Sequence, residues 1–281
     1  MAITASMVKE LRDMTGAGMM ECKKALTEAD ADMDKAVDLL REWGVAKVAK
    51  KAGRATNEGT VMALVAEDGK SGAVIQLNCE TDFVSMNEKF KGYADQVARI
   101  ELEKKYADAE ALKADADVDA IITDCVHVMG ENTQLSKAAY VEGGAVCSYI
   151  HMGGKIGVLV ELACDKPCEK LDEAAHMVCL QVAANAPKYV NPADVPQAEI
   201  DAEIEIKLNA LKEQKGKLPP EQALVGIKKG MAQKFCTQIC LVKQDYVADG
   251  EQTVEQYLAS VAKEIGAPIT VKRFARLQLG A

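Results

Sequence analysis

Apolar residues at helical spacing predict three short helices within the first 54 residues. The first helix has one apolar face, made by Val8, Leu11 and Met14. Gly16 and Gly18 then favour a turn, because glycines this close together weaken a helix. A second helix is predicted from about Met19, and Asp32 or Asp34 can cap a third. With the basic link that follows, this pattern predicts a small module over residues 1–54.

A switch to alternating apolar and polar residues predicts a β-hairpin next. Its strands are expected over Thr60–Ala66 and Gly72–Cys79. Ser85 and Glu88 have the spacing of a capping box, so a helix is expected to follow. Phe83 therefore lies at a strand-to-helix corner. A ring at such a corner either packs in the core, as large apolar side chains usually do, or contacts another protein.

The hairpin recurs when the sequence is shifted by 85 residues. Seven of 21 positions are identical, against about one or two expected from average residue usage. The identical pairs are Gly59 and Gly144, Val61 and Val146, Gly69 and Gly154, Lys70 and Lys155, Gly72 and Gly157, Leu77 and Leu162, and Cys79 and Cys164. The second hairpin is also followed by a helical pattern, from about Glu169 to Asn185. We infer two related β-hairpin-plus-helix units.

The two units differ at their corners. Thr81-Asp82-Phe83 has no counterpart, because Lys166-Pro167 stands at that place in the second unit. His151 replaces Ala66 at the end of the first strand. Features private to one unit are better functional candidates than features that the shared fold requires.

An antiparallel coiled-coil hairpin is predicted over about residues 196–235, inserted in the second unit. Its two narrow apolar seams are Ile200, Ile204, Leu208 and Leu211, and then Leu224, Ile227, Met231 and Phe235. Gly216–Pro220 breaks the helical pattern between them. A strand over Cys236–Val242, a helix over Thr253–Ile265 and a strand over Ile269–Gln278 are expected to complete an α+β fold.

Composition and charge narrow the function. The 281 residues carry a net charge of −9, which argues against direct binding of nucleic acid. No apolar run approaches the ~18 residues of a membrane span, and the first residues do not resemble a signal peptide, so a cytoplasmic protein is expected. The nine cysteines form no Cys-x-x-Cys pair, and no metal site or cofactor is expected.

Signatures of enzymes are sparse. The sequence has no phosphate-binding loop of the NTPase type, no nucleophile elbow and no zinc-protease motif. Met152–Gly157 is glycine-rich but lies within a hairpin, so a turn is favoured over a phosphate cradle. A cysteine-dependent enzyme stays an alternative, and it would need a thiol with a strongly lowered pKa. A generic adaptor that binds through residues 1–54 alone is a second alternative.

Two long motifs point to a known family. Leu11–Leu26 and Leu77–Ser85 resemble the two signatures of the bacterial elongation factor Ts family, and Tyr149–Val160 resembles a third stretch of it. The resemblance covers nearly the whole chain. It implies a ubiquitin-associated-like three-helix module over 1–54, core subdomains over 55–139 and 140–281, and a coiled-coil arm. It also implies that the C-terminal helical module of some members is missing here.

The resemblance further implies a nucleotide-exchange factor, not an enzyme, that binds elongation factor Tu in its GDP-bound and nucleotide-free forms. Thr81, Asp82, Phe83 and Val84 would enter the GTPase domain and dislocate its magnesium. Other contacts with elongation factor Tu are implied for Arg12, Met19, Met20, Asn78 and His151. A homodimer or a 2:2 complex is compatible with the paired units. The sequence departs from the family pattern at Gln76, Met86 and Lys155.

Overall fold

Three helices at the amino terminus enclose an apolar cluster of their own. The computed structural model describes residues 3–216 and 219–280. The three helices are α1 (Ala5–Thr15), α2 (Met19–Glu28) and α3 (Met33–Lys51). Asp32 caps α3, since its side chain accepts a hydrogen bond from Lys35 N. Leu11 and Leu26 are fully buried between the helices. Helix α3 is longer than predicted and takes in most of the basic link, because no glycine interrupts it between Gly44 and Gly53.

Two three-stranded antiparallel sheets follow. The first sheet has the order β1 (Glu58–Val65), β2 (Ser71–Cys79) and β3 (Gln134–Glu142), and the second has the order β4 (Ala145–His151), β5 (Ile156–Ala163) and β6 (Thr270–Gln278). The register shifts once in each central strand, between Gln76 and Leu77 and between Glu161 and Leu162. These two irregularities are again 85 residues apart, so the internal repeat extends to local backbone detail.

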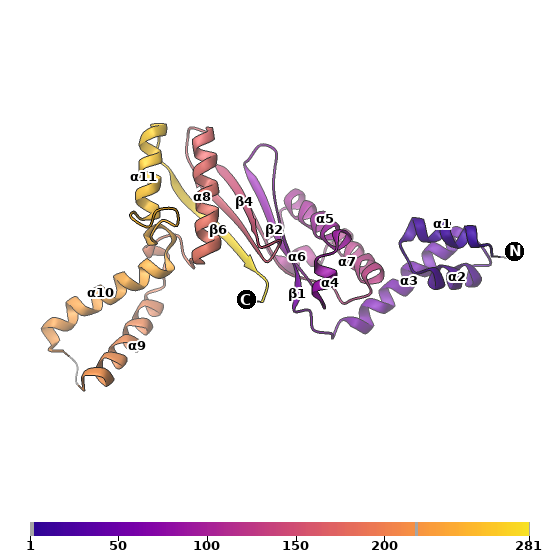
Figure 1. The fold of residues 1–281 in the computed structure, drawn as a ribbon, viewed down its shortest axis with the longest axis horizontal. Helices are drawn as coiled ribbons and strands as arrows, with labels where there is room; N and C mark the ends of the chain where they lie inside the picture. The colour runs from indigo at the N-terminus through magenta and orange to yellow at the C-terminus, as the bar shows by residue number, and fades with distance from the viewer. Residues whose placement is uncertain (1–2, 217–218, 281) are drawn as a thin grey trace.

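The sheets pack face to face, and helices cover their outer faces (Figure 1). Helices α5 (Glu88–Lys104) and α7 (Ala116–Met129) cover the first sheet, joined by the short helix α6 (Ala109–Lys113). Helices α8 (Glu169–Asn185) and α11 (Val254–Ile265) cover the second sheet. This mixture of helices and antiparallel sheets agrees with the predicted α+β class.

Reciprocal contacts relate the two sheets. A Cβ added at Gly72 would lie 3.0 Å from side-chain atoms of Val146 and Leu159. A Cβ added at Gly157 would lie 2.3 Å from Val61 and 3.2 Å from Val74. Each contact maps onto the other under the 85-residue shift, as expected for two copies facing one another across a pseudo-two-fold axis. Small residues at this position let the sheets approach closely.

A pair of helices projects from the second unit (Figure 1). Helices α9 (Gln197–Lys215) and α10 (Glu221–Ile239) pack against each other, and the predicted Gly216–Pro220 break separates them, although residues 217–218 of that break lie outside the described residues. Short 3-10 turns flank the pair at Pro192–Asp194 and Leu241–Lys243. Among the described helices, none combines the length and apolar character needed to cross a membrane.

The predicted strand over Cys236–Val242 is wrong. Helix α10 continues to Ile239, and a 3-10 turn follows. Cys236, Cys240 and Leu241 are buried, so the apolar run reflects the packing of a helix end. A short apolar run cannot distinguish a buried strand from a buried helix segment by spacing alone.

Candidate functional site

The corner between β2 and α5 contains an additional helical turn, α4 (Asp82–Ser85). Thr81 caps it, with its side chain accepting a hydrogen bond from Val84 N at 3.5 Å. The predicted capping box at Ser85 is wrong. Asn87 caps α5 by accepting from Lys89 N at 2.9 Å, whereas Ser85 lies inside α4 and donates to the Asp82 carbonyl. The motif therefore builds a separate turn before the long helix.

Phe83 projects from this turn into solvent. Its side chain is 83% exposed, the highest value among the large exposed apolar residues of the described structure. Its neighbour Val84 instead packs against the core cluster beneath α5, which includes Ile75 and Phe90. Val84 thus anchors the turn and directs Phe83 outward. The structure contradicts the interpretation of Phe83 as a core ring.

Glu131, in the loop that follows α7, holds the turn by hydrogen bonds. One of its carboxylate oxygens accepts hydrogen bonds from the backbone N–H groups of Glu80 and Thr81, at 3.1 and 3.0 Å. The other oxygen accepts from the Thr81 hydroxyl at 2.6 Å. Hydrogen bonds to a charged acceptor are stronger than neutral ones. The corner is therefore a clamped element and not a free loop.

A second layer of polar contacts supports this clamp. The Glu80 carboxylate accepts from Asn132 N at 2.7 Å and pairs with the Arg54 guanidinium at 3.3 Å. The Asn132 side chain donates to the Arg54 carbonyl at 2.8 Å. Sequence reasoning missed Glu131 and Asn132, because about fifty positions separate them from the motif and no spacing rule connects them.

The other predicted residues of the motif differ in accessibility. Asp82 is exposed beside Phe83. Asn78 is only 6% exposed, and it donates to the carbonyls of Thr56 and Glu58 and accepts from Gln76 and Ser136. Its polar groups are thus used within the chain, and its contact with a partner stays a prediction.

His151 lies at the same end of the sandwich as the corner. It ends β4 and is exposed, and its Nδ1 is 3.0 Å from the Tyr149 hydroxyl. In the turn that follows, Lys155 forms an ion pair with Glu58 at 3.0 Å, and Glu58 pairs in register with Cys79. The glycine-rich turn docks on β1, since Val61 N donates to the Gly154 carbonyl at 2.7 Å.

The predicted residues of the first module are also exposed. Met19 and Met20 are 54% and 76% exposed at the start of α2, and Arg12 is exposed on α1. They belong to the three-helix module, whereas Phe83 and His151 belong to the sandwich. The structure thus distributes the predicted contacts over two parts of the molecule.

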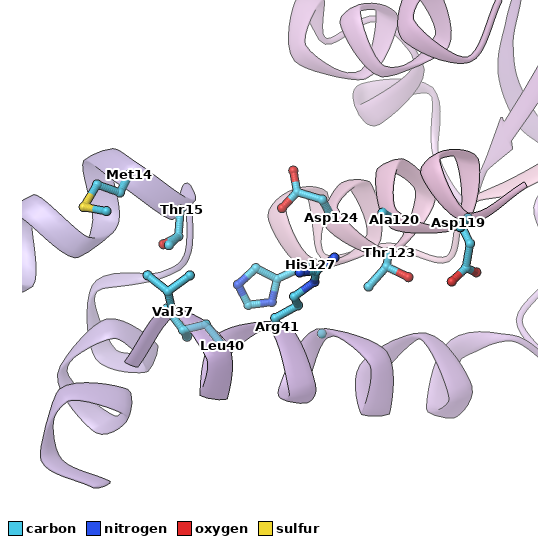
Figure 2. Close-up of a pocket in the computed structure, with 12 residues that line it drawn as sticks. Met14, Thr15, Val37, Leu40, Arg41, Asp119, Ala120, Thr123, Asp124 and His127 are labelled. Atoms are coloured by element: carbon cyan, nitrogen blue, oxygen red, sulfur yellow. The ribbon is translucent and has the colours of Figure 1, made fainter. Parts of the chain in front are cut away.

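A cavity of about 470 Å³ lies where these two parts meet (Figure 2). Met14 and Thr15 of α1, residues of α3 and residues of α7 line it. His127 of α7 points into this seam, and its Nε2 is 3.8 Å from the carboxylate of Glu21 on α2. None of the predicted contact residues lines this cavity, so we assign it to the junction between the parts.

The metal-binding and cysteine-enzyme alternatives can be checked on the described residues. No group of three or more His, Cys, Asp or Glu side chains among them could hold a metal ion. Burial raises the pKa of the thiols of Cys22, Cys79, Cys125 and Cys240. A nucleophilic thiol requires a lowered pKa, so these four do not support the cysteine-enzyme alternative. Cys147 on β4 differs from them, because hydrogen bonding to Cys179 and the neighbouring His176 lower its pKa.

Comparison with known proteins now decides the family. A family model described as elongation factor TS matches residues 80–281, more than half of the chain. The chain belongs to the elongation factor Ts family. Elongation factor Ts from Clostridium perfringens strain SM101 is 44% identical over 286 residues, covering 99% of this chain and 93% of the relative. Elongation factor Ts from Clostridium botulinum strain Eklund 17B is 43% identical, with the same coverage.

This membership confirms the resemblance drawn from the two motifs. Elongation factor Ts proteins are nucleotide-exchange factors for elongation factor Tu in translation elongation, and not catalysts of bond formation. The Thr81–Val84 corner, which carries the second motif, lies within the matched range. Its outward ring on a clamped turn suits a surface that acts by binding.

Proposed function

We propose that this chain binds elongation factor Tu with GDP bound and accelerates GDP release through the Thr81–Val84 corner. The observation that carries the proposal is the 83% exposed Phe83 on a turn held by Val84 and Glu131. An ordered aromatic side chain loses little conformational entropy on binding, so it can anchor an interface. Phe83 enters an apolar pocket of the GTPase domain.

Asp82 acts beside the ring. Its exposed carboxylate approaches the elements of the GTPase that hold magnesium and the phosphates. Magnesium neutralises the phosphate charge in such GTPases, so displacing it weakens the hold on GDP. Arg12, Met19, Met20 and His151 enlarge the contact surface. Binding free energies are reciprocal. If GDP lowers the affinity of the GTPase for this chain by some ratio, this chain must lower the affinity of the GTPase for GDP by the same ratio.

Stopped-flow release of fluorescent GDP from elongation factor Tu tests this proposal. Wild-type protein should accelerate release strongly. Phe83→Ala should reduce the acceleration at least about tenfold, since loss of an interface anchor costs more than about 1.4 kcal/mol. Its fold should be unchanged, because the ring makes little contact with its own chain.

Met86→Ala is the matched control. Met86 is 63% exposed in the same corner but lies outside α4, and its substitution should change release less than about threefold. No acceleration by the wild-type protein would refute the exchange proposal. Acceleration that survives in folded Phe83→Ala would refute the role of the ring and direct attention to the first module.

A further inference from the structure

A pair of thiols and a histidine lie together in the second unit, away from the α4 corner. Cys147 lies on β4, and Cys179 lies on α8, which packs on that strand. The 85-residue shift places Met62 at the position of Cys147. Cys179 is the eleventh residue of α8, and Ala98 is the eleventh residue of α5. The first unit therefore builds the same packing without thiols, and the pair is private to the second unit.

The Cys179 thiol lies directly against the backbone of Cys147. The Cys179 sulfur lies 3.4 Å from the Cys147 carbonyl oxygen, to which its S–H group can donate. The Cys147 sulfur in turn lies 3.7 Å from the carbonyl oxygen of Ser148, to which its S–H group can donate. Cys179 is fully buried, whereas Cys147 is only partly buried. Of the two residues, only Cys147 therefore has surface in contact with solvent.

His176 completes the group. It lies one helical turn before Cys179 on α8, and its ring packs edge-on against Tyr149, two residues after Cys147 on β4. The hydrogen bond from Cys179 lowers the pKa of Cys147, and His176 lowers it further against the effect of burial. The pKa of Cys179 is raised, first by its hydrogen bond with Cys147 and then by burial. One sulfur is therefore prepared as the nucleophile, and the other keeps its proton.

Other uses of this group are less consistent with the structure. Two cysteines and one histidine would be the smallest cluster able to hold a metal, and none is found among the described residues. The partial exposure of Cys147 and its polar neighbours distinguish it from the buried thiols of the first unit, Cys79 and Cys125.

We propose that Cys147 is a peroxide-reactive thiol and that Cys179 resolves it to a disulfide joining β4 to α8. The Cys147 thiolate attacks one oxygen of a hydroperoxide, the O–O bond breaks, and a sulfenic acid forms with release of water from hydrogen peroxide. The Cys179 sulfur then attacks the sulfenic sulfur. Its proton leaves with the displaced hydroxide as a second water, and His176 can relay that proton. A dithiol reductant restores both thiols.

The modification reaches a predicted contact residue. Tyr149 packs edge-on against the His176 ring at 5.8 Å between centroids, and its hydroxyl is 3.0 Å from His151 Nδ1. A disulfide between β4 and α8 would therefore alter the packing of Tyr149 on His176, and with it the position of His151 at the exposed end of β4. The chemistry itself does not depend on the proposed exchange function.

The test uses the full-length reduced protein and hydrogen peroxide, with quenching, differential alkylation and peptide mass mapping over time. The expected product is a Cys147–Cys179 disulfide that a dithiol reverses. Cys168 is the internal control, because it is exposed and no sulfur or imidazole contact is found for it in the described structure. Cys147 should react at least about tenfold faster than Cys168.

Two variants separate the steps. Cys179→Ala, which introduces the alanine that α5 carries, should stop at a Cys147 sulfenic acid trapped by a 1,3-diketone. Cys147→Ser should leave Cys179 reduced. The proposal is overturned if Cys147 reacts no faster than Cys168, or if the disulfide maps to Cys164 and Cys168. Measurement of GDP release is not needed for either outcome.

Discussion

The two halves of the sandwich share a framework and differ at one corner. In both, a cysteine lies at the end of the central strand, Cys79 as the last residue of β2 and Cys164 directly after β5. Each thiol donates to the carbonyl two residues later, from Cys79 to Thr81 and from Cys164 to Lys166. In both, a 17-residue helix follows. Glu88 comes nine positions after Cys79, but Glu169 comes five positions after Cys164. The difference of four residues equals the length of α4.

This comparison separates the part of the protein that maintains the fold from the part that we propose to bind a partner. The sheets and long helices form the repeated framework, and the surface that we propose to bind the partner is an insertion in one copy of it. An insertion can vary without disturbing the core, whereas its base must be fixed to hold an aromatic anchor in place. In the first unit α4 is such an insertion, and Val84 and Glu131 hold its base in place.

Shortening the first corner to the length of the second should have the largest effect on GDP release, because it removes the main difference between the two units. Deletion of Asp82–Ser85 removes Phe83 and leaves the five-position connection that the second unit already uses. We expect GDP release to fall at least about a hundredfold, because an anchor and its neighbours are lost together. Stopped-flow release measures the loss, and circular dichroism checks the fold. Exchange at the wild-type rate by the shortened protein would show that α4 is dispensable.

A buried carboxyl group is the next difference between the halves. Glu101 is fully buried in α5, whereas the fully buried Val182 occupies the same position in α8. Burial, with help from the charge of Asp108, raises the pKa of Glu101 from 4.5 to about 7. The folded protein therefore holds this proton to higher pH than the unfolded chain does. Stability from this group is complete below about pH 4.5 and is lost as the pH rises to about 7.

Glu101→Gln should remove this part of the pH dependence. The pKa difference corresponds to at most about 3 kcal/mol of unfolding free energy between pH 4.5 and 8. Urea unfolding of the wild type and the variant at several pH values measures it, and the difference between the two curves isolates Glu101 from the other titrating groups. Parallel curves would contradict the raised pKa.

Much of the framework could be predicted from the sequence. Periodicity placed the first hairpin and the projecting helix pair, and the 85-residue repeat placed the second hairpin. The matched register shifts after Gln76 and Glu161 were not predicted and are a finding of the structure. The failures occurred where tertiary packing decided between similar local signals. Cys236–Val242 is apolar enough for a strand but ends a buried helix, and Ser85 has a capping sequence but lies in a different turn.

Only part of the candidate site could be predicted from the sequence. The Thr81–Val84 motif could be found, because its resemblance to a family signature does not depend on folding. The direction of Phe83 could not, since composition favours a buried ring. Glu131 could not be found at all, because its contact with Thr81 spans fifty positions. Contacts of that kind arise only when β2 and the loop before β3 are brought together.

The smallest of the expected effects concerns Glu131, which holds the inserted turn in the first unit. The loop before β3 carries it directly after Gly130, which ends α7, and the loop before β6 carries Ala267 directly after Gly266, which ends α11. The second unit thus has alanine where the first has the clamp. There, Lys166 bonds to the Gly266 carbonyl at 2.8 Å instead. The clamp therefore accompanies the inserted turn and is not a requirement of the fold.

Glu131→Ala should loosen the turn without unfolding the sandwich. Loss of a charged acceptor with three hydrogen bonds should lower the unfolding free energy by about 2 kcal/mol and slow GDP release about fivefold, since a mobile anchor pays more entropy on binding. Hydrogen exchange at the Glu80 and Thr81 amides should quicken. Glu131→Gln keeps one carbonyl acceptor and should fall between alanine and wild type. Unchanged or slower amide exchange in Glu131→Ala would contradict the clamp. Faster amide exchange with full GDP-release activity would show that the function of the corner does not depend on its rigidity.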